Sequence, residues 1–388
     1  AAYMADGYAR ISGLPGICLA QSVGAANLSA GLQDAYLAHS PVIAVTGRKL
    51  PSHQHRNAYQ EIAHSPSFSQ VTKFSAEVDS ADSLPRVFRQ AWTSATTGTP
   101  GPSHIDLYGL SGEFVESGIV SETDNCEAST KLTIPTSRLL PHEHELEHAV
   151  SLLLNASRIV IVAGTGAALS NCGSELLEIG ERLSAPIGTS LGGRGLINTQ
   201  HKLSIGTVGT YSAPPANEIV SKADLVFFIG CGTGDQPTNT WLVPSIDTPV
   251  VQIDINPLEL GRTYPNTVGL IGDPKRTLQE LISLLVEPIS DNTFSQWAFD
   301  LVKNWRTDQA SLDTSSNIPI CPDRLCAEIS NLLPEDGILV SDTGYSGIWT
   351  STLIELNGTS QTYLRAAGSL GWSLPASLGA KCAAPKRK

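Results

Sequence analysis

The C-terminal end of the chain contains a glycine-rich segment, Gly368–Lys381, whose backbone could bind a ligand. The segment predicts a tight turn that opens a helix of small residues, including Ala376, Gly379 and Ala380. Glycine has no side chain to keep a ligand away, and the amide groups at the start of a helix attract anions. The pattern therefore predicts a backbone site for an anion and a helix that can pack closely against a sheet.

A second pattern, His144-Glu145-Leu146-Glu147-His148, matches the H-E-x-x-H arrangement of zinc proteases. At about 100° per residue, both histidines lie opposite the apolar stripe of such a helix. That stripe consists of Leu146, Val150, Leu153 and Leu154. Glu175 or Glu178 could be a third ligand, but a catalytic zinc needs ligands that face a cleft. We interpret the pattern as a solvated helix start, leave a metalloprotease as an alternative, and assign no metal ligand.

Glycines also follow predicted strands in the middle of the chain. Gly164-Thr165-Gly166 resembles the start of a dinucleotide fingerprint, but Leu169 stands where the third glycine would be. We interpret it as a tight turn. The segments Thr189–Gly195 and Gly230–Gly234 follow further strands of the same block. A cofactor crevice therefore stays an alternative for this part of the chain.

Three α/β blocks must position these segments, because predicted strands alternate with predicted helices, which is typical of a parallel sheet. In the first block we expect strands at Gly16–Ala20, Val42–Thr46 and Ser103–Leu107, and helices near Ala25–Ala38 and Ser83–Thr97. In the second, Rossmann-like block we expect a helix at His142–Asn155 and strands at Arg158–Ala163, Leu225–Gly230 and Pro249–Ile255. Near Phe294–Trp305 we expect a helix. In the third block we expect a helix at Asp323–Leu333, a strand at Gly337–Ser341 and a helix near Ser346–Leu356.

The composition excludes several classes of protein. With 41% hydrophobic and 16% charged residues among 388, the chain is globular, and no apolar run reaches the ~20 residues of a membrane span. A net charge of −12 and scattered basic residues argue against a nucleic-acid surface. The seven cysteines form no Cys-x-x-Cys pair, which indicates reduced thiols in a cytoplasmic protein. No signal peptide is visible.

Six motifs in this order and spacing carry a resemblance to a known family: Gln21–Asn27, Pro41–Gly47, Ala58–Glu61, Gly98–Pro102, Ser341–Ser346 and the Gly368 turn. Together they resemble the thiamine diphosphate enzymes of the acetolactate synthase, pyruvate oxidase and pyruvate decarboxylase group. The resemblance implies an α/β fold of three parallel-sheet domains. These are a pyrimidine-binding domain over residues 1–112, a linker over 113–140, a central Rossmann-like domain over 141–288, a linker over 289–320, and part of a diphosphate-binding domain over 321–388.

The resemblance also implies where the cofactor binds. In this family the cofactor lies between the pyrimidine domain of one subunit and the diphosphate domain of another, so we expect a homodimer or homotetramer. Gly24 and Asn27 would approach it from the pyrimidine side. The backbone of Gly368, followed by Ser369, would bind the aminopyrimidine, and Leu370 would hold the two rings in a bent shape. The diphosphate would be held by Asp342, Thr343, Gly344, Tyr345 and Ser346.

Catalytic roles carried over from the family fall on Gln60, Leu370 and Asn27. Gln60 matches a polar residue near the reacting carbonyl, and Tyr59 an aromatic wall. Without the other motifs, the Tyr59–Glu61 segment would be a plain surface loop and Leu370 an ordinary core leucine. Pyruvate decarboxylases carry an adjacent histidine pair, whereas a residue separates His53 from His55 here. That departure favours a carboligase or an oxidase-like member.

Two functional groups of the family would lie beyond the chain. The activating glutamate would precede Ala1, and the Gly-Asp-Gly motif that binds Mg²⁺ would follow Lys388. We therefore expect a chain truncated at both ends, with the Mg²⁺ ligands outside it. FAD occurs in the family, but we do not favour it, because Gly230–Asp235 lacks the arginine of FAD-binding members. Acetolactate synthases usually have methionine where Leu370 stands, so the substrate does not follow from this position.

The resulting hypothesis is a thiamine diphosphate- and Mg²⁺-dependent enzyme that decarboxylates a 2-oxo acid and ligates the product to an acceptor carbonyl. We expect this activity in the full-length parent and expect the present chain alone to be inactive. The expected partner is a small-molecule 2-oxo acid, without nucleic acid or membrane. A non-oxidative decarboxylase or an acyl-CoA-type lyase of the same family is an alternative. An alternative from another class is a non-catalytic nucleotide-binding protein.

Overall fold

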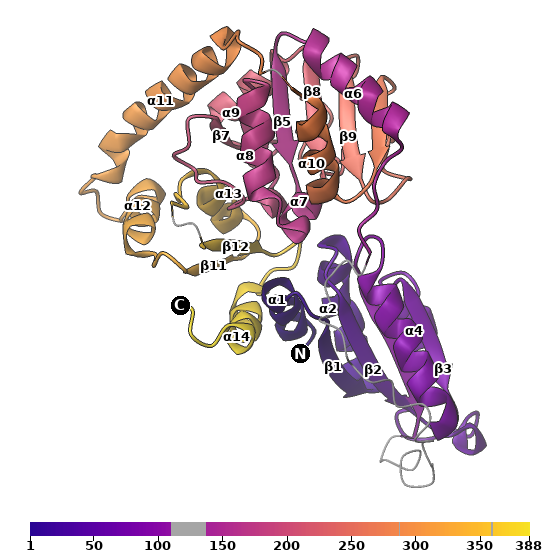
Figure 1. Cartoon of the computed structure of the whole chain (residues 1–388). Helices are drawn as coiled ribbons and strands as arrows, with labels where there is room; N and C mark the ends of the chain where they lie inside the picture. The colour runs from indigo at the N-terminus through magenta and orange to yellow at the C-terminus, as the bar shows by residue number, and fades with distance from the viewer. Residues whose placement is uncertain (110–136, 287, 358–359) are drawn as a thin grey trace. The chain divides into compact units, whose positions relative to one another are not determined.

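The computed structural model describes residues 1–109, 137–286, 288–357 and 360–388. Chain contacts divide these residues into two compact units (Figure 1). Unit 1 consists of Ala1–Ser137 together with Ala366–Arg387, and unit 2 of Arg138–Arg365 with Lys388. Most of the linker expected over 113–140, and Cys126 with it, lies outside the described residues. The three-domain boundaries stay a prediction, because compact units need not coincide with domains.

Unit 1 is built on a parallel sheet of four strands in the order β1-β2-β4-β3. The strands are β1 (Gly16–Gln21), β2 (Val42–Arg48), β3 (Phe74–Val78) and β4 (Ser103–Tyr108). The helices that follow them include α2 (Val23–Leu37), α3 (Ser65–Phe68) and α4 (Leu84–Thr96). The predicted strands and helices of this block are confirmed within two residues at either end. The strand β3 and the helix α3 were not expected, because Phe-Ser-Ala-Glu-Val is short and half polar and α3 has only four residues.

Two helices from opposite ends of the sequence pack together in unit 1. They are α1 (Ala2–Ser12) and α14 (Ser373–Ala383), and Figure 1 shows them side by side. A Cβ atom at Gly7 would overlap the backbone of Ala376, and one at Gly379 would overlap the backbone of Met4. The small residues of α14 do allow close packing, but the prediction of its partner was wrong: among the described residues, α14 packs against the helix α1 and not against a sheet.

Unit 2 contains a parallel sheet of six strands in the order β10-β9-β8-β5-β6-β7. The strands are β5 (Ile159–Ala163), β6 (Ile187–Thr189), β7 (Ser204–Thr207), β8 (Leu225–Ile229), β9 (Val250–Asp254) and β10 (Thr267–Ile271). Strands β5, β8 and β9 are confirmed as predicted. Strand β6 was expected before Thr189 but without bounds, and β7 and β10 were missed, because they are short or half exposed and contain glycine.

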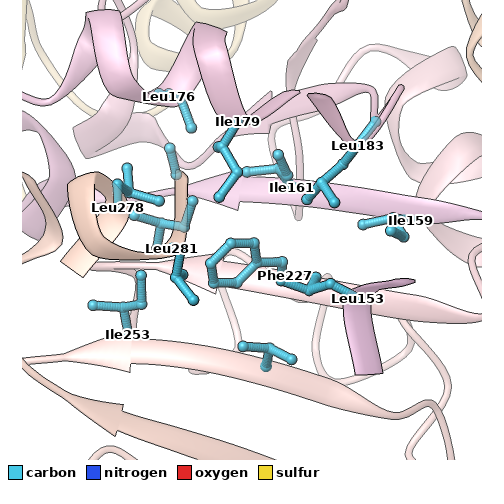
Figure 2. Close-up of a cluster of buried hydrophobic side chains, with 14 of the residues drawn as sticks. Leu153, Ile159, Ile161, Leu176, Ile179, Leu183, Phe227, Ile253, Leu278 and Leu281 are labelled. Atoms are coloured by element: carbon cyan, nitrogen blue, oxygen red, sulfur yellow. The ribbon is translucent and has the colours of Figure 1, made fainter. Parts of the chain in front are cut away.

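Helices cover both faces of this sheet, because its strands alternate between two apolar clusters. Ile159 and Ile161 of β5 face a cluster with α6 (Glu143–Asn155), α8 (Gly173–Arg182) and α10 (Pro274–Leu284), part of which Figure 2 shows. Val160 and Val162 face a second cluster with α9 (Pro214–Ser221) and α11 (Thr293–Asp313). A short helix, α7 (Thr165–Ser170), follows β5. The predicted α/β class with parallel sheets is confirmed.

The remaining elements of unit 2 form a small second sheet. It pairs β11 (Ile338–Ser341) with β12 (Thr362–Arg365) in parallel. The helices α12 (Pro322–Leu332) and α13 (Tyr345–Thr352) accompany it. Helix α11 extends to Asp313, further than its predicted end at Trp305.

The histidine-rich pattern lies on α6 as predicted, and His144 and His148 are both exposed. The buried residues of this helix are Leu146, Ala149 and Leu153. The prediction for Leu154 was wrong: it is 49% exposed, because Ala149 lies closer to the centre of the buried face. Among the described residues, no group of three or more His, Cys, Asp or Glu is placed to hold a metal ion.

Two further expectations concern the chain as a whole. Four cysteines are buried, Cys18, Cys172, Cys231 and Cys326, and all six in the described ranges are free thiols. No helix of the described residues is long and apolar enough to cross a membrane.

Candidate functional site

The loop between β1 and α2 and the segment with Gln60 meet at the carboxyl end of the unit 1 sheet. The buried hydroxyl of Ser22 donates a hydrogen bond of 2.8 Å to the main-chain oxygen of Gln60. Ser22 and Gln60 both have positive φ, 46° and 60°, so both lie in a backbone region that L residues rarely adopt. Gly24 is half-buried and Asn27 exposed on the first turns of α2. The structure therefore brings Gln60 to the loop that precedes these residues.

A carboxylate from α2 holds the glycine-rich turn in place. Asp34 is 1% exposed, and its side chain accepts hydrogen bonds from the amides of Ala367, Gly368 and Ser369, at 2.8, 3.1 and 2.9 Å. The turn thus binds an anion, as predicted from its glycines, but that anion is a side chain of the chain itself. Sequence reasoning missed Asp34, because a single acidic residue on a helix carries no local signal.

The next residues after this turn expose one leucine and bury one tryptophan. Leu370 is 79% exposed, so the alternative of an ordinary core leucine is wrong. Trp372 is fully buried, and its indole N–H donates a 2.9 Å hydrogen bond to Asp6. Leu370 therefore lies between two anchored points, the amides bound by Asp34 and the indole bound by Asp6.

One arginine links both anchors. The guanidinium of Arg10 donates to the two carboxylate oxygens of Asp6 at 2.8 and 2.7 Å and reaches Asp34 at 3.4 Å. Its carbon Cζ lies 4.6 Å from the ring centre of Trp372, a distance at which a cation is attracted to an aromatic face. Two buried acids thus share one cation, and α1, α2 and the turn before α14 are connected through it.

A second buried network supports the segment that carries Gln60. Asp106 of β4 accepts a 2.7 Å hydrogen bond from Thr46, and its Oδ1 lies 2.9 Å from Nδ1 of His64. Thr46 also lies 2.7 Å from Nε2 of His104. Burial lowers the pKa of His104 to about 4, so this imidazole is neutral at pH 7. His64 therefore connects the end of the Gln60 segment to the sheet.

The turn predicted to hold the diphosphate lies in unit 2, between β11 and α13. Gly344 precedes the helix with φ 74° and ψ −149°, a conformation open to glycine and strained for other residues. The carboxylate of Asp342 accepts the amide of Thr343 at 3.2 Å, and the hydroxyl of Ser346 donates to the carbonyl of Thr343 at 2.9 Å. Tyr345 is 73% exposed, and its ring lies 5.7 Å from that of Trp349.

A cation that sequence reasoning missed stands beside this turn. Arg365, the last residue of β12, donates from Nη2 to the hydroxyl of Thr343 at 3.3 Å. Its Cζ lies 5.0 Å from the ring centre of Tyr211. Because β12 is paired with β11, Arg365 reaches the turn that follows β11. A strand-to-helix turn with a neighbouring arginine has the chemistry of an anion site.

Comparison with known proteins gives the family. Residues 1–67 match the model "Thiamine pyrophosphate enzyme, N-terminal TPP binding domain", and residues 146–281 match "Thiamine pyrophosphate enzyme, central domain". The turns at Asp342–Ser346 and Gly368–Leu370 lie outside both matched ranges. Thiamine pyrophosphate is another name for thiamine diphosphate.

Similar curated proteins agree with that match. A probable acetolactate synthase large subunit of Methanococcus aeolicus is 31% identical over 403 residues, which cover 100% of this chain and 67% of the relative. The corresponding protein of Methanocaldococcus jannaschii is 31% identical, with 99% and 66% covered. A putative thiamine pyrophosphate-containing protein of Bacillus subtilis, YdaP, is 28% identical, with 100% and 65% covered. The chain thus spans about two thirds of the length of these relatives, and it belongs to the thiamine pyrophosphate enzyme family.

Proposed function

We propose that the protein containing this chain joins 2-oxo acids by thiamine diphosphate-dependent decarboxylation and carboligation. The names of similar proteins support this proposal, since several are acetolactate synthases. When bound, thiamine diphosphate supplies the electron sink that accepts the electron pair left by departing CO₂. The observation that carries the proposal is Leu370, an exposed leucine on a turn anchored on both sides.

The exposed side chain of Leu370 suits an apolar support for the cofactor. A leucine that is 79% exposed gains little from burial within its own unit. In the proposed site it would pack under the two rings of the cofactor and exclude water from the reacting carbon. Asp34 would fix the position of Leu370 relative to the cofactor, because its carboxylate binds the amides of the two preceding residues. With those amides occupied, the main-chain oxygen of Gly368 is the group we assign to the aminopyrimidine.

The turn from Asp342 to Ser346 fits the diphosphate group. Amides of the first turn of a helix have no acceptor within that helix and point outward. The positive φ of Gly344 lets the backbone approach an anion closely. We add Arg365 to the proposed set, because its guanidinium already contacts Thr343 in this turn.

On the pyrimidine side we assign Gly24 and Asn27 to the cofactor and Gln60 to the carbonyl of the substrate. The hydrogen bond from Ser22 to Gln60 supports that grouping.

The relatives' names also support a larger assembly, and we propose a homodimer or homotetramer with sites between subunits. We place the Mg²⁺ ligands outside this chain, do not favour FAD, and propose a cytoplasmic location. The chain alone would then be inactive.

The experiment is a product assay on the complete protein with thiamine diphosphate, Mg²⁺ and pyruvate. We expect acetolactate, and we expect Leu370→Ala to lower kcat about tenfold or more while the protein stays folded. The control Leu258→Ala changes a leucine of similar exposure, 73%, in unit 2 and should leave kcat unchanged. Acetaldehyde as the sole product would indicate a decarboxylase instead. No turnover of any 2-oxo acid, with no thiamine diphosphate binding, would refute the proposal.

A further inference from the structure

Unit 2 contains a cavity of about 80 Å³ between β7, α11 and the residues around α13. Its lining includes four charged side chains, Arg194, Arg306, Asp313 and Glu355, together with Thr207 and Gln309. All of these residues belong to unit 2. None of them is part of the proposed thiamine diphosphate site, so the cavity needs its own explanation.

Arg194 is a buried cation without an acidic partner. It is 7% exposed, and no carboxylate of the described residues lies within 4.0 Å of its guanidinium. Its Nη1 donates to the hydroxyl of Thr207 at 3.3 Å, and its Nη2 donates to the carbonyl of Ile354. Its buried Nε has no hydrogen-bond partner. Because a buried charge is costly without a counter-charge and full hydrogen bonding, this arrangement is incomplete.

Two side chains of α11 add polar groups to the same cavity. Arg306 donates from Nη1 to Gln200 at 3.3 Å and from Nη2 to the carbonyl of Thr199. The buried Oε1 of Gln309 has no partner. The amide of a glutamine can be turned by 180° without a change of shape, which would direct an N–H donor to this position. The cavity thus combines two guanidinium groups with an unused amide.

The acidic residues of the lining are less available to pair with Arg194. Glu355 accepts hydrogen bonds from the side-chain amides of Gln200 and Asn357. Burial raises the pKa of Asp313, and the nearby charges of Asp323 and Glu355 raise it further. Neither carboxylate lies within ion-pair distance of the guanidinium of Arg194, so this cation has no direct acidic partner among the described residues.

We propose that this cavity binds a small oxyanion of three or four heavy atoms, a short carboxylate or bicarbonate, as the counter-ion of Arg194. Its volume of about 80 Å³ is roughly half of the ~150 Å³ that accommodates benzene, which favours a small anion over a larger one. A planar oxyanion matches the parallel N–H groups of a guanidinium. The site is independent of thiamine diphosphate and of the proposed reaction.

The test follows the thermal unfolding of this chain as formate is added, with gluconate, which is too large for the cavity, keeping the ionic strength constant. A ligand that binds only the folded state raises Tm with a saturable dependence on its concentration. We expect formate to do so, and benzoate, which exceeds the cavity, to have no effect. Equal Tm values in formate and gluconate would mean that the cavity holds only water, and would overturn the proposal.

Variants locate the effect. Arg194→Met removes the charge and keeps the length of the side chain, so it should abolish the formate dependence of Tm. If that variant fails to fold, Arg306→Gln and Gln309→Leu test the same site and should weaken formate binding about tenfold. The control Arg276→Gln changes an exposed arginine of α10 and should keep the full response. A response of the same size in all variants would place formate elsewhere.

Discussion

The carboxylate of Asp34 accepts the amide of Gly368 at 3.1 Å, although the two residues are 334 positions apart. Two neighbouring amides bind the same carboxylate, which fixes the backbone immediately before Leu370. A residue of an early helix thereby determines the conformation of the last glycine-rich turn. The geometry of the proposed cofactor support depends on this buried side chain on one side and on the hydrogen bond from Trp372 to Asp6 on the other.

Replacing Asp34 with asparagine should destabilise unit 1. The variant loses a charged acceptor of three amides and leaves an NH₂ group facing N–H groups. We expect a loss of ~2–4 kcal/mol, since charge-assisted hydrogen bonds are worth more than neutral ones and a broken buried pair is costly. Urea unfolding measures it. Asp82→Asn, at an exposed site of the same unit, should change the free energy of unfolding little; equal effects of the two would refute the role of Asp34.

The packing of α1 against α14 predicts the effect of one methyl group. A Cβ at Gly379 would overlap the backbone of Met4 and Tyr8, so Gly379→Ala should cost ~1–3 kcal/mol as the helices separate. Alanine is the better helix former, so a gain in stability would contradict this packing. Gly234→Ala is the matched control, because nothing lies within 4 Å of the added methyl group there. Chemical denaturation of both variants gives the comparison.

The buried imidazole of His104 should make the free energy of unfolding depend on pH. Burial lowers the pKa of this imidazole from 6.5 to about 4, so between these values the unfolded chain binds a proton that the folded chain does not. The contribution of His104 to the free energy of unfolding is therefore fully present above pH 6.5. It decreases as the pH falls toward 4, by up to about 3 kcal/mol.

The measurement is the free energy of unfolding at several pH values from 7 to 5. His104→Asn should be less stable at pH 7 but should lose less stability on acidification than the wild type. His148→Asn, which changes an exposed histidine of α6, should keep the wild-type dependence. Parallel curves for wild type and His104→Asn would show that another group causes the loss.

Arg365 predicts a change in cofactor affinity that is separate from the chemical step. Arg365→Gln in the complete protein removes the cation beside Thr343 and should raise the KM for thiamine diphosphate about tenfold, with kcat at saturating cofactor nearly unchanged. Arg158→Gln, which changes a side chain that is 52% exposed, should have no effect on this KM. An unchanged KM in Arg365→Gln would remove Arg365 from the diphosphate site.

Several elements could be predicted because their signals are local. The apolar runs of β1, β2, β5, β8 and β9 are long enough to stand out between polar turns. The glycines before α14 indicate a turn, and Gly379 within that helix indicates close packing. The six motifs were sufficient to identify the family, since their order and spacing are properties of the sequence itself. Strands such as β7, with four residues and a glycine, have no such signal.

The sequence by itself thus determined the α/β class, the main strands and the family of this protein. Tertiary structure alone decided that Asp34 binds the turn at Gly368, that Leu370 is exposed while Trp372 is buried, and that Arg365 reaches Thr343. The reason is physical: periodicity and turn chemistry act over a few neighbouring residues, whereas a buried carboxylate finds its donors only when distant segments pack together. In the sequence, residues such as Asp34 and Arg365 cannot be distinguished from solvated residues of the same type.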